Sequence, residues 1–120
     1  MSESQNPKQY DLEERTEKFA ANCRSFVRKL PKTLTNIEDV KQLVRSSGSV
    51  AVNYIEANES LSKKDFFYRI KICRKESKEV GLWLRLLYVG NKDELNSERN
   101  DLNQESIELM KIFGSILKNK

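Results

Sequence analysis

Residues 60–66 read SLSKKDF, and this short stretch decides the fold. Ser62 followed three residues later by Asp65 has the form of a capping box, which predicts the start of a helix. Leu61 and Phe66 are placed to pack across that start as a hydrophobic staple. The helical pattern before the stretch lasts almost to Ser62, so the connection is a very short turn. Two helices joined by so short a turn lie antiparallel to each other.

Apolar residues recur at helical spacing on both sides of this turn. Asp11 with Glu14, and Asn36 with Asp39, offer two more capping boxes, and Pro31 forces the chain out of helical geometry between them. The third helix ends ahead of a glycine, a usual C-terminal residue. The start of the fourth is the least defined, because the surrounding sequence is polar throughout. We therefore predict four helices, over residues 12–29, 37–60, 63–89 and 98–118.

The fold class follows from what this pattern contains and lacks. No stretch alternates strictly between polar and apolar residues, and no internal repeat is present. The sequence predicts an all-α protein, an antiparallel up-down-up-down four-helix bundle. With 120 residues the chain is long enough for one hydrophobic core and too short for two. We expect residues 1–120 to form a single domain, with residues 1–9 as a flexible tail.

Composition indicates a soluble protein. Hydrophobic residues make up 38% of the chain and charged residues 33%, and no apolar run is long enough to span a bilayer. The N-terminus is polar and lacks the apolar segment of a signal peptide, so we expect a cytoplasmic protein without a membrane partner. Cys23 and Cys73 fall on the core stripes of different helices, and we expect both to remain thiols in a reducing cytosol.

The absence of histidine argues against an enzyme. It removes the commonest general base and the commonest transition-metal ligand together. Ser47 lies in a polar inset of the second helix, but a nucleophilic serine needs a base. Close helix packing, with the Ser47 hydroxyl bonded to a carbonyl of the preceding turn, explains it more simply. We expect no catalytic residue, no metal site and no cofactor.

A basic strip on the third helix is the first candidate for function. Its members lie within about 60° of one line on a helical wheel, opposite the core stripe. Such a strip could follow a phosphate backbone, and the net charge of +4 is compatible with that but does not demand it. The alternative is an ordinary solvated helix face. With one residue of the second helix, the candidate nucleic-acid contacts are Arg45, Lys64, Lys71, Arg74, Lys75, Lys78 and Arg85.

An apolar excess on the same helix is the second candidate. Ile72, Trp83 and Leu86 lie off the main core stripe, so burial of that stripe leaves them uncovered. A contiguous apolar patch usually marks a protein interface, and tryptophan is enriched at such sites. These residues predict a surface for self-association. The alternative is a wide core that covers Trp83 with a neighbouring helix.

The amino-acid sequence also resembles that of a known family. YDLEERTEKFA at 10–20, RKLPKTL at 28–34 and the long stretch 42–87, which contains RSSGSV and FYRIKICRKESKEVGLWL, are similar to the bacterial four-helix bundle proteins also called intervening-sequence proteins. Some members are encoded inside insertions of large-subunit ribosomal RNA genes and are often labelled ribosomal proteins. Ala57 and Asn58 stand where the family often has glycine, a departure that indicates a packing variation.

The resemblance implies an up-down bundle that assembles as a homopentameric ring and has no established enzymatic activity. A relative, the accessory variability determinant of diversity-generating retroelements, is a basic pentamer that binds nucleic acid and a reverse transcriptase. For this chain, that role is an analogy based on the fold alone.

Two hypotheses follow from the residues and the resemblance. The first is a non-enzymatic homo-oligomer, pentameric by resemblance, whose basic strip contacts RNA or DNA. The second is a protein-interaction or scaffold module with a protein partner and no role for nucleic acid. The sequence names neither the nucleic acid, nor the partner, nor the pathway.

Overall fold

The computed structural model describes the backbone of residues 7–119 and the side chains of residues 12–119. This part of the chain contains four helices and no strand, so the predicted all-α four-helix fold is confirmed. The helices are α1 (Pro7–Val27), α2 (Leu34–Asn58), α3 (Lys63–Leu86) and α4 (Asp93–Leu117).

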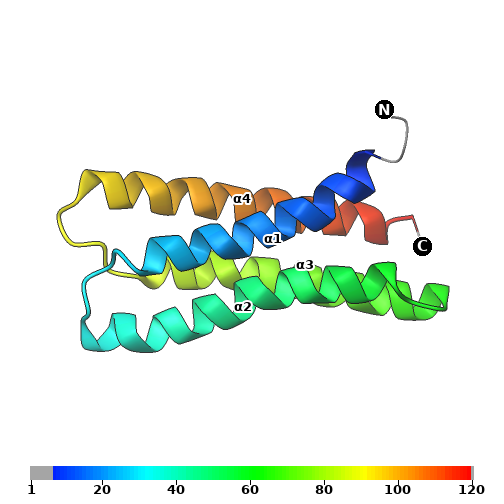
Figure 1. The fold of residues 1–120 in the computed structure, drawn as a ribbon, viewed down its shortest axis with the longest axis horizontal. Helices are drawn as coiled ribbons and strands as arrows, with labels where there is room; N and C mark the ends of the chain where they lie inside the picture. The colour runs from blue at the N-terminus through cyan, green and yellow to red at the C-terminus, as the bar shows by residue number, and fades with distance from the viewer. Residues whose placement is uncertain (1–6, 120) are drawn as a thin grey trace.

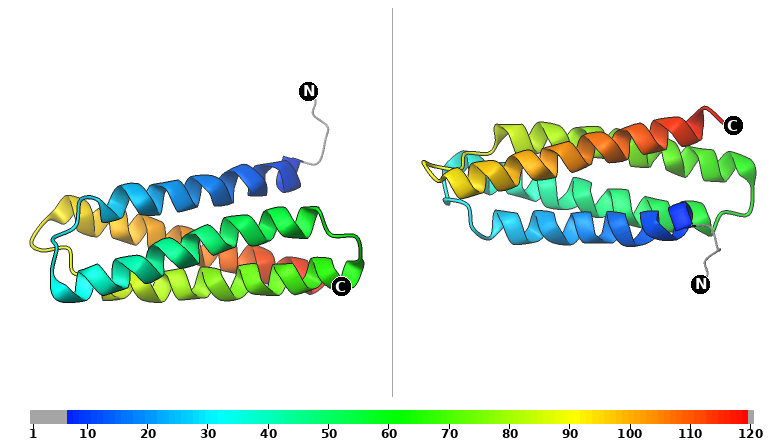
Figure 2. Two further views of the ribbon diagram at one scale, coloured as in Figure 1. Left: turned by 60° about the horizontal axis from the view of Figure 1, so that its bottom comes forward. Right: turned by 90° about the horizontal axis from the view of Figure 1, so that it is seen from above.

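Consecutive helices run in opposite directions along the long axis of the bundle (Figure 1). Each helix packs against two others, in the cyclic order α1, α2, α3, α4, and the diagonal pairs make no close backbone contact. The two loops before α2 and before α4 lie together at one end, and the α2–α3 turn lies at the other (Figures 1 and 2). The packing is therefore that of an up-down-up-down bundle.

All four helices contribute apolar side chains to one continuous core. Each buried side chain of this size stabilises the fold by about 1.5–3 kcal/mol relative to its exposed state. The largest fully buried members are Phe19, Phe26, Leu43, Val50, Ile70, Val80, Leu84, Leu87, Leu109 and Phe113. The two cysteines also lie in this core with free thiols, and burial raises the pKa of each to about 12, so both stay neutral at ordinary pH.

The predicted start of α3 is confirmed. Ser62 adopts extended backbone geometry, and its hydroxyl accepts a hydrogen bond of 3.0 Å from the backbone N–H of Asp65. The predicted staple is wrong, because Leu61 is fully exposed. Phe66 packs instead edge-on against the ring of Phe67, with 5.2 Å between ring centroids.

The predicted start of α1 is wrong by about a turn. The helix begins at Pro7, a favourable first residue because its ring fixes φ near the helical value. Asp11 therefore lies inside the helix, and residues 7–9 belong to it and not to a tail. Residues 1–6, the rest of the predicted tail, lie outside the described residues.

The predicted cap of α2 is also wrong. The helix begins at Leu34, and its N-cap is Thr33, whose hydroxyl accepts a hydrogen bond of 3.1 Å from the backbone N–H of Asn36. Asn36 has a different role, because its side chain is buried and joins two loops. Its Nδ2 donates to the carbonyls of Pro31, at 2.9 Å, and Tyr88, at 2.8 Å, and its Oδ1 accepts from the N–H of Tyr88 at 2.9 Å.

The same contact helps to explain why α3 ends before the predicted residue 89. The backbone N–H and carbonyl of Tyr88 are bonded to Asn36, so they cannot join the helical ladder, and the chain is already extended at Leu87. Gly90 then takes a left-handed conformation, with φ of 72°, in the turn. The fourth helix begins at Asp93 and not at residue 98, with Asp93 and Glu94 in its first turn, where carboxylates favour the helix dipole.

Ion pairs connect α1 and the loop just after it to α4. Arg15 contacts Glu105 at 2.7 Å and Glu108 at 2.9 Å, and Lys29 contacts Glu98 at 2.7 Å. The side-chain hydrogen bond to Glu105 raises the pKa of Arg15 above its ordinary value. These pairs are partly exposed, so each contributes at most about 1 kcal/mol, and they chiefly fix the alignment of the two helices.

Replacement of Asn36 by alanine tests whether its side chain holds the two loops together. The substitution leaves the backbone groups of Tyr88 and the carbonyl of Pro31 without these buried partners, so we expect the free energy of unfolding to fall by about 2–4 kcal/mol. Urea denaturation followed by circular dichroism measures the change. The matched control is Asn22→Ala, at an exposed position of α1, which should shift stability by less than about 0.5 kcal/mol. Equal effects of the two substitutions would contradict this role of Asn36.

Candidate functional site

The basic strip predicted from the sequence lies on the solvent face of α3. We use the name basic strip for six exposed residues of this helix. Their exposure follows from the core stripe, because Ile70, Cys73, Val80 and Leu84 turn the opposite face of the helix inward. The six residues are Lys64, Lys71, Arg74, Lys75, Lys78 and Arg85.

Arg45, the seventh predicted contact, is engaged elsewhere. It reaches from α2 to α3, where its guanidinium contacts Glu76 at 3.3 Å and Glu79 at 3.4 Å. Glu76 is only 5% exposed, and a buried carboxylate needs a cation close to it. Arg45 therefore compensates a buried charge, and it is less available to an external phosphate than the residues of the basic strip.

Members of the basic strip differ in how free they are. Lys75 lies 3.9 Å from Glu76, and Arg85 donates a hydrogen bond of 3.2 Å to Oδ1 of Asn103 on α4. Within the part of the chain that the structure describes, the other four make no ion pair and no side-chain hydrogen bond. These four unengaged cations are Lys64, Lys71, Arg74 and Lys78.

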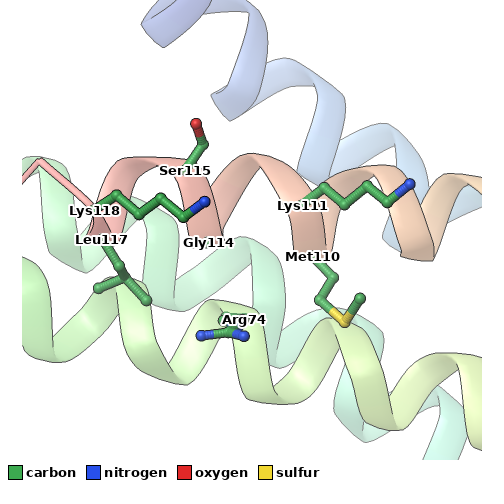
Figure 3. Close-up of a pocket in the computed structure, with 7 residues that line it drawn as sticks. All are labelled: Arg74, Met110, Lys111, Gly114, Ser115, Leu117 and Lys118. Carbon is green, nitrogen blue, oxygen red and sulfur yellow. The ribbon is translucent and has the colours of Figure 1, made fainter.

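Arg74 also lines a hollow between α3 and α4 that the sequence did not reveal (Figure 3). The hollow has a volume of about 460 Å³. In Figure 3, Lys118 runs back along α4 toward Gly114, and Lys111 extends in the same direction, away from Gly114. The guanidinium of Arg74, which comes from α3, lies beside Gly114. Among the residues that the structure describes, three cations and no carboxylate line it. These lining residues are Arg74, Met110, Lys111, Gly114, Ser115, Leu117 and Lys118.

A glycine opens this hollow. A methyl group at Gly114 would lie 3.8 Å from Nε of Arg74, an ordinary contact distance, so packing does not require glycine there. Glycine inside a helix costs about 1 kcal/mol relative to alanine. Gly81 differs, because a methyl group there would meet Asn103 and Ser106 of α4 at 3.2 Å, and close helix approach accounts for it.

A sequence signal for the hollow did exist on α4. Lys111, Gly114 and Lys118 lie three to seven residues apart, so they share one helix face. Seen alone, that face looks like a solvated surface. Only the alignment of α4 against α3 brings it beside Arg74.

The apolar residues predicted as an interface are distributed unevenly. Leu86 is 54% exposed, whereas Ile72 and Trp83 are half-buried. Trp83 packs partly against the core, and its indole N–H is buried with no hydrogen-bond partner within residues 12–119. Two further exposed apolar side chains on α3, Tyr68 and Leu82, were not predicted and enlarge the apolar surface beside the basic strip.

The polar inset of α2 serves packing, as predicted. The hydroxyl of Ser47 is buried and donates a hydrogen bond of 3.3 Å to the carbonyl of Val44 in the preceding turn. A methyl group at Gly48 would lie 3.1 Å from the guanidinium of Arg24, which itself donates to the Val44 carbonyl. Small residues here allow α1 to approach α2.

Other classes of site find no support in the described part of the chain. No group of three or more cysteine, aspartate or glutamate residues there could hold a metal ion. Among the helices described, none is both long and apolar enough to cross a membrane.

These features define an all-α bundle protein with a basic helix face and a cationic hollow. The chain belongs to the 23S rRNA-intervening sequence protein family, whose sequence model matches residues 8–115. This finding confirms the family that the sequence resembles. No curated protein matches the chain.

A solved structure supports the same assignment. The chain is similar to a protein with unknown function from the S23 ribosomal protein family of Bacteroides thetaiotaomicron. The two share 27% sequence identity and a TM-score of 0.79, and the match covers 92% of this chain and 98% of the other. Neither comparison attaches an enzymatic activity to the fold.

Substitution of Gly114 by alanine tests whether packing requires glycine. The methyl group fits beside Arg74, so we expect Gly114→Ala to raise the free energy of unfolding by about 1 kcal/mol, which thermal denaturation measures. The control is Gly81→Ala, which should gain nothing because Asn103 and Ser106 must move aside. A loss of stability in Gly114→Ala would contradict our account of the hollow.

Proposed function

We propose that the protein is a non-enzymatic homo-oligomer that binds RNA or DNA through the basic strip of α3. The observation that carries the proposal is the set of four exposed cations on that strip that have no partner among the residues described by the structure. Cations held for stability alone are usually found beside carboxylates, as are Arg15 on α1 and Lys29 just after it. Cations left unpaired along one line are suited to a polyanion, where each neutralised phosphate releases a counterion.

The homo-oligomer rests on a separate argument. Leu86, Leu82 and Tyr68 expose apolar surface along α3, and association removes such surface from water. The resemblance to the intervening-sequence proteins implies a pentamer. A ring of five copies would also repeat the basic strip five times, and several strips engaging one strand would strengthen binding without any new contact.

The nucleic-acid part of the proposal is tested by charge reversal. The double substitution Arg74→Glu with Lys78→Glu should weaken binding of a labelled single-stranded RNA at least ten-fold, because two phosphate contacts become repulsive. It should also flatten the dependence of affinity on salt concentration. Fluorescence anisotropy titrations between 50 and 200 mM salt measure both effects.

The control has the same change of charge at another place. Lys18→Glu with Arg28→Glu alters two exposed cations on and just after α1, and it should have a much smaller effect. Salt-independent binding, or equal effects of the two double variants, would refute the role of the basic strip. A protein partner that remains bound in a pulldown after nuclease treatment would favour the scaffold function instead.

The oligomer is tested by light scattering. We expect a mass five times the 14.0 kDa of one chain. Leu86→Glu should shift the protein toward smaller species, because a carboxylate would be desolvated at the proposed interface. Leu61→Glu changes a fully exposed leucine in the α2–α3 turn and should leave the mass unchanged. A mass of one chain for the wild-type protein would contradict the proposed pentamer.

A further inference from the structure

The hollow beside Gly114 contains positive charge that the fold does not use. Arg74, Lys111 and Lys118 line it, and none of them forms an ion pair or side-chain hydrogen bond with the residues that the structure describes. Three like charges around one hollow repel one another, and no carboxylate lies among the lining residues to offset the repulsion. An anion in the hollow would offset it.

The shape of the hollow suits an anion with several oxygen atoms. The Arg74 guanidinium is a planar fork of donors that can bind two oxygens of one phosphate, and the Lys118 ammonium lies across from it over Gly114 (Figure 3). Met110 and Leu117 flank the guanidinium on either side.

The glycine is the independent observation. A cation near the C-terminus of α4 is favoured by the helix dipole, so the dipole alone could explain Lys118. It does not explain Gly114, where alanine would fit and would favour the helix. A stabilising residue is commonly absent where function needs the space, and here the space lies directly in front of Arg74.

We infer that this hollow is a phosphate-binding pocket, with Arg74 and Lys118 as its principal ligands and Lys111 at its rim. In its functional use it would hold one phosphate of a nucleic-acid backbone, a step that rests on the proposed function. The basic strip continues directly from the pocket, because Lys71 and Lys78 lie three and four residues from Arg74 on the same helix. The pocket extends the nucleic-acid surface from α3 onto α4.

Inorganic phosphate tests the pocket without nucleic acid. Phosphate should raise the thermal midpoint of the wild-type protein by about 2 °C or more relative to chloride at equal ionic strength. The rise should disappear in Gly114→Leu, which fills the hollow while it keeps every charge, and in Lys118→Gln. It should persist in Asn100→Leu and Lys18→Gln, which introduce the same residues, leucine and glutamine, at exposed positions outside the pocket.

Binding of a labelled single-stranded RNA forms the second arm. Gly114→Leu and Lys118→Gln should each weaken it about three- to ten-fold, and Lys18→Gln less than two-fold. If phosphate raises the thermal midpoint but the protein binds no RNA, the pocket is supported and the proposed function is refuted. If wild type and Gly114→Leu bind RNA equally, and phosphate does not raise the thermal midpoint, the pocket is refuted and the proposed function is not.

Discussion

The packing of α2 against α3 is the constraint on which the surface of this protein depends. Polar contacts fix the register of these two helices: the Cys73 thiol donates to the Val50 carbonyl at 3.6 Å, and Arg69 donates to Asn53 at 2.9 Å. Once the inner face of α3 is committed to α2 and α4, its lysine-rich face has no other helix to cover it. Exposure of the basic strip is therefore a consequence of core packing.

The parts of the fold that the sequence predicted are those decided locally. The start of α3 was predicted because Ser62 and Asp65 meet within one turn of helix and nothing distant competes for them. The start of α2 was not, because Thr33 and Asn36 are both good caps. The choice between them depends on Tyr88, which lies 52 residues from Asn36 in the chain. Helical periodicity contains no information about such a contact.

The same division applies to the candidate site. The position of the basic strip on one face follows from the helical period alone, so the wheel placed it correctly. The engagement of Arg45 by Glu76 and the hollow beside Gly114 depend on how neighbouring helices are aligned, and a wheel treats each helix separately. Sequence reasoning could find the cations of the strip, but it could not sort those that offset a buried carboxylate from those that are free.

The two halves of α4 show why this distinction matters. Up to Glu108 the helix is rich in carboxylates, and Arg15 on α1 and Lys29 just after α1 form ion pairs with three of them. Beyond Glu108 its charged side chains are lysines, and the neighbouring side chain across the hollow is Arg74, another cation. Had charge served only to align the helices, the second half would be expected to repeat the pairing of the first. Among the described residues, the cations at this end have no carboxylate beside them and repel one another, and a bound polyanion would offset that repulsion.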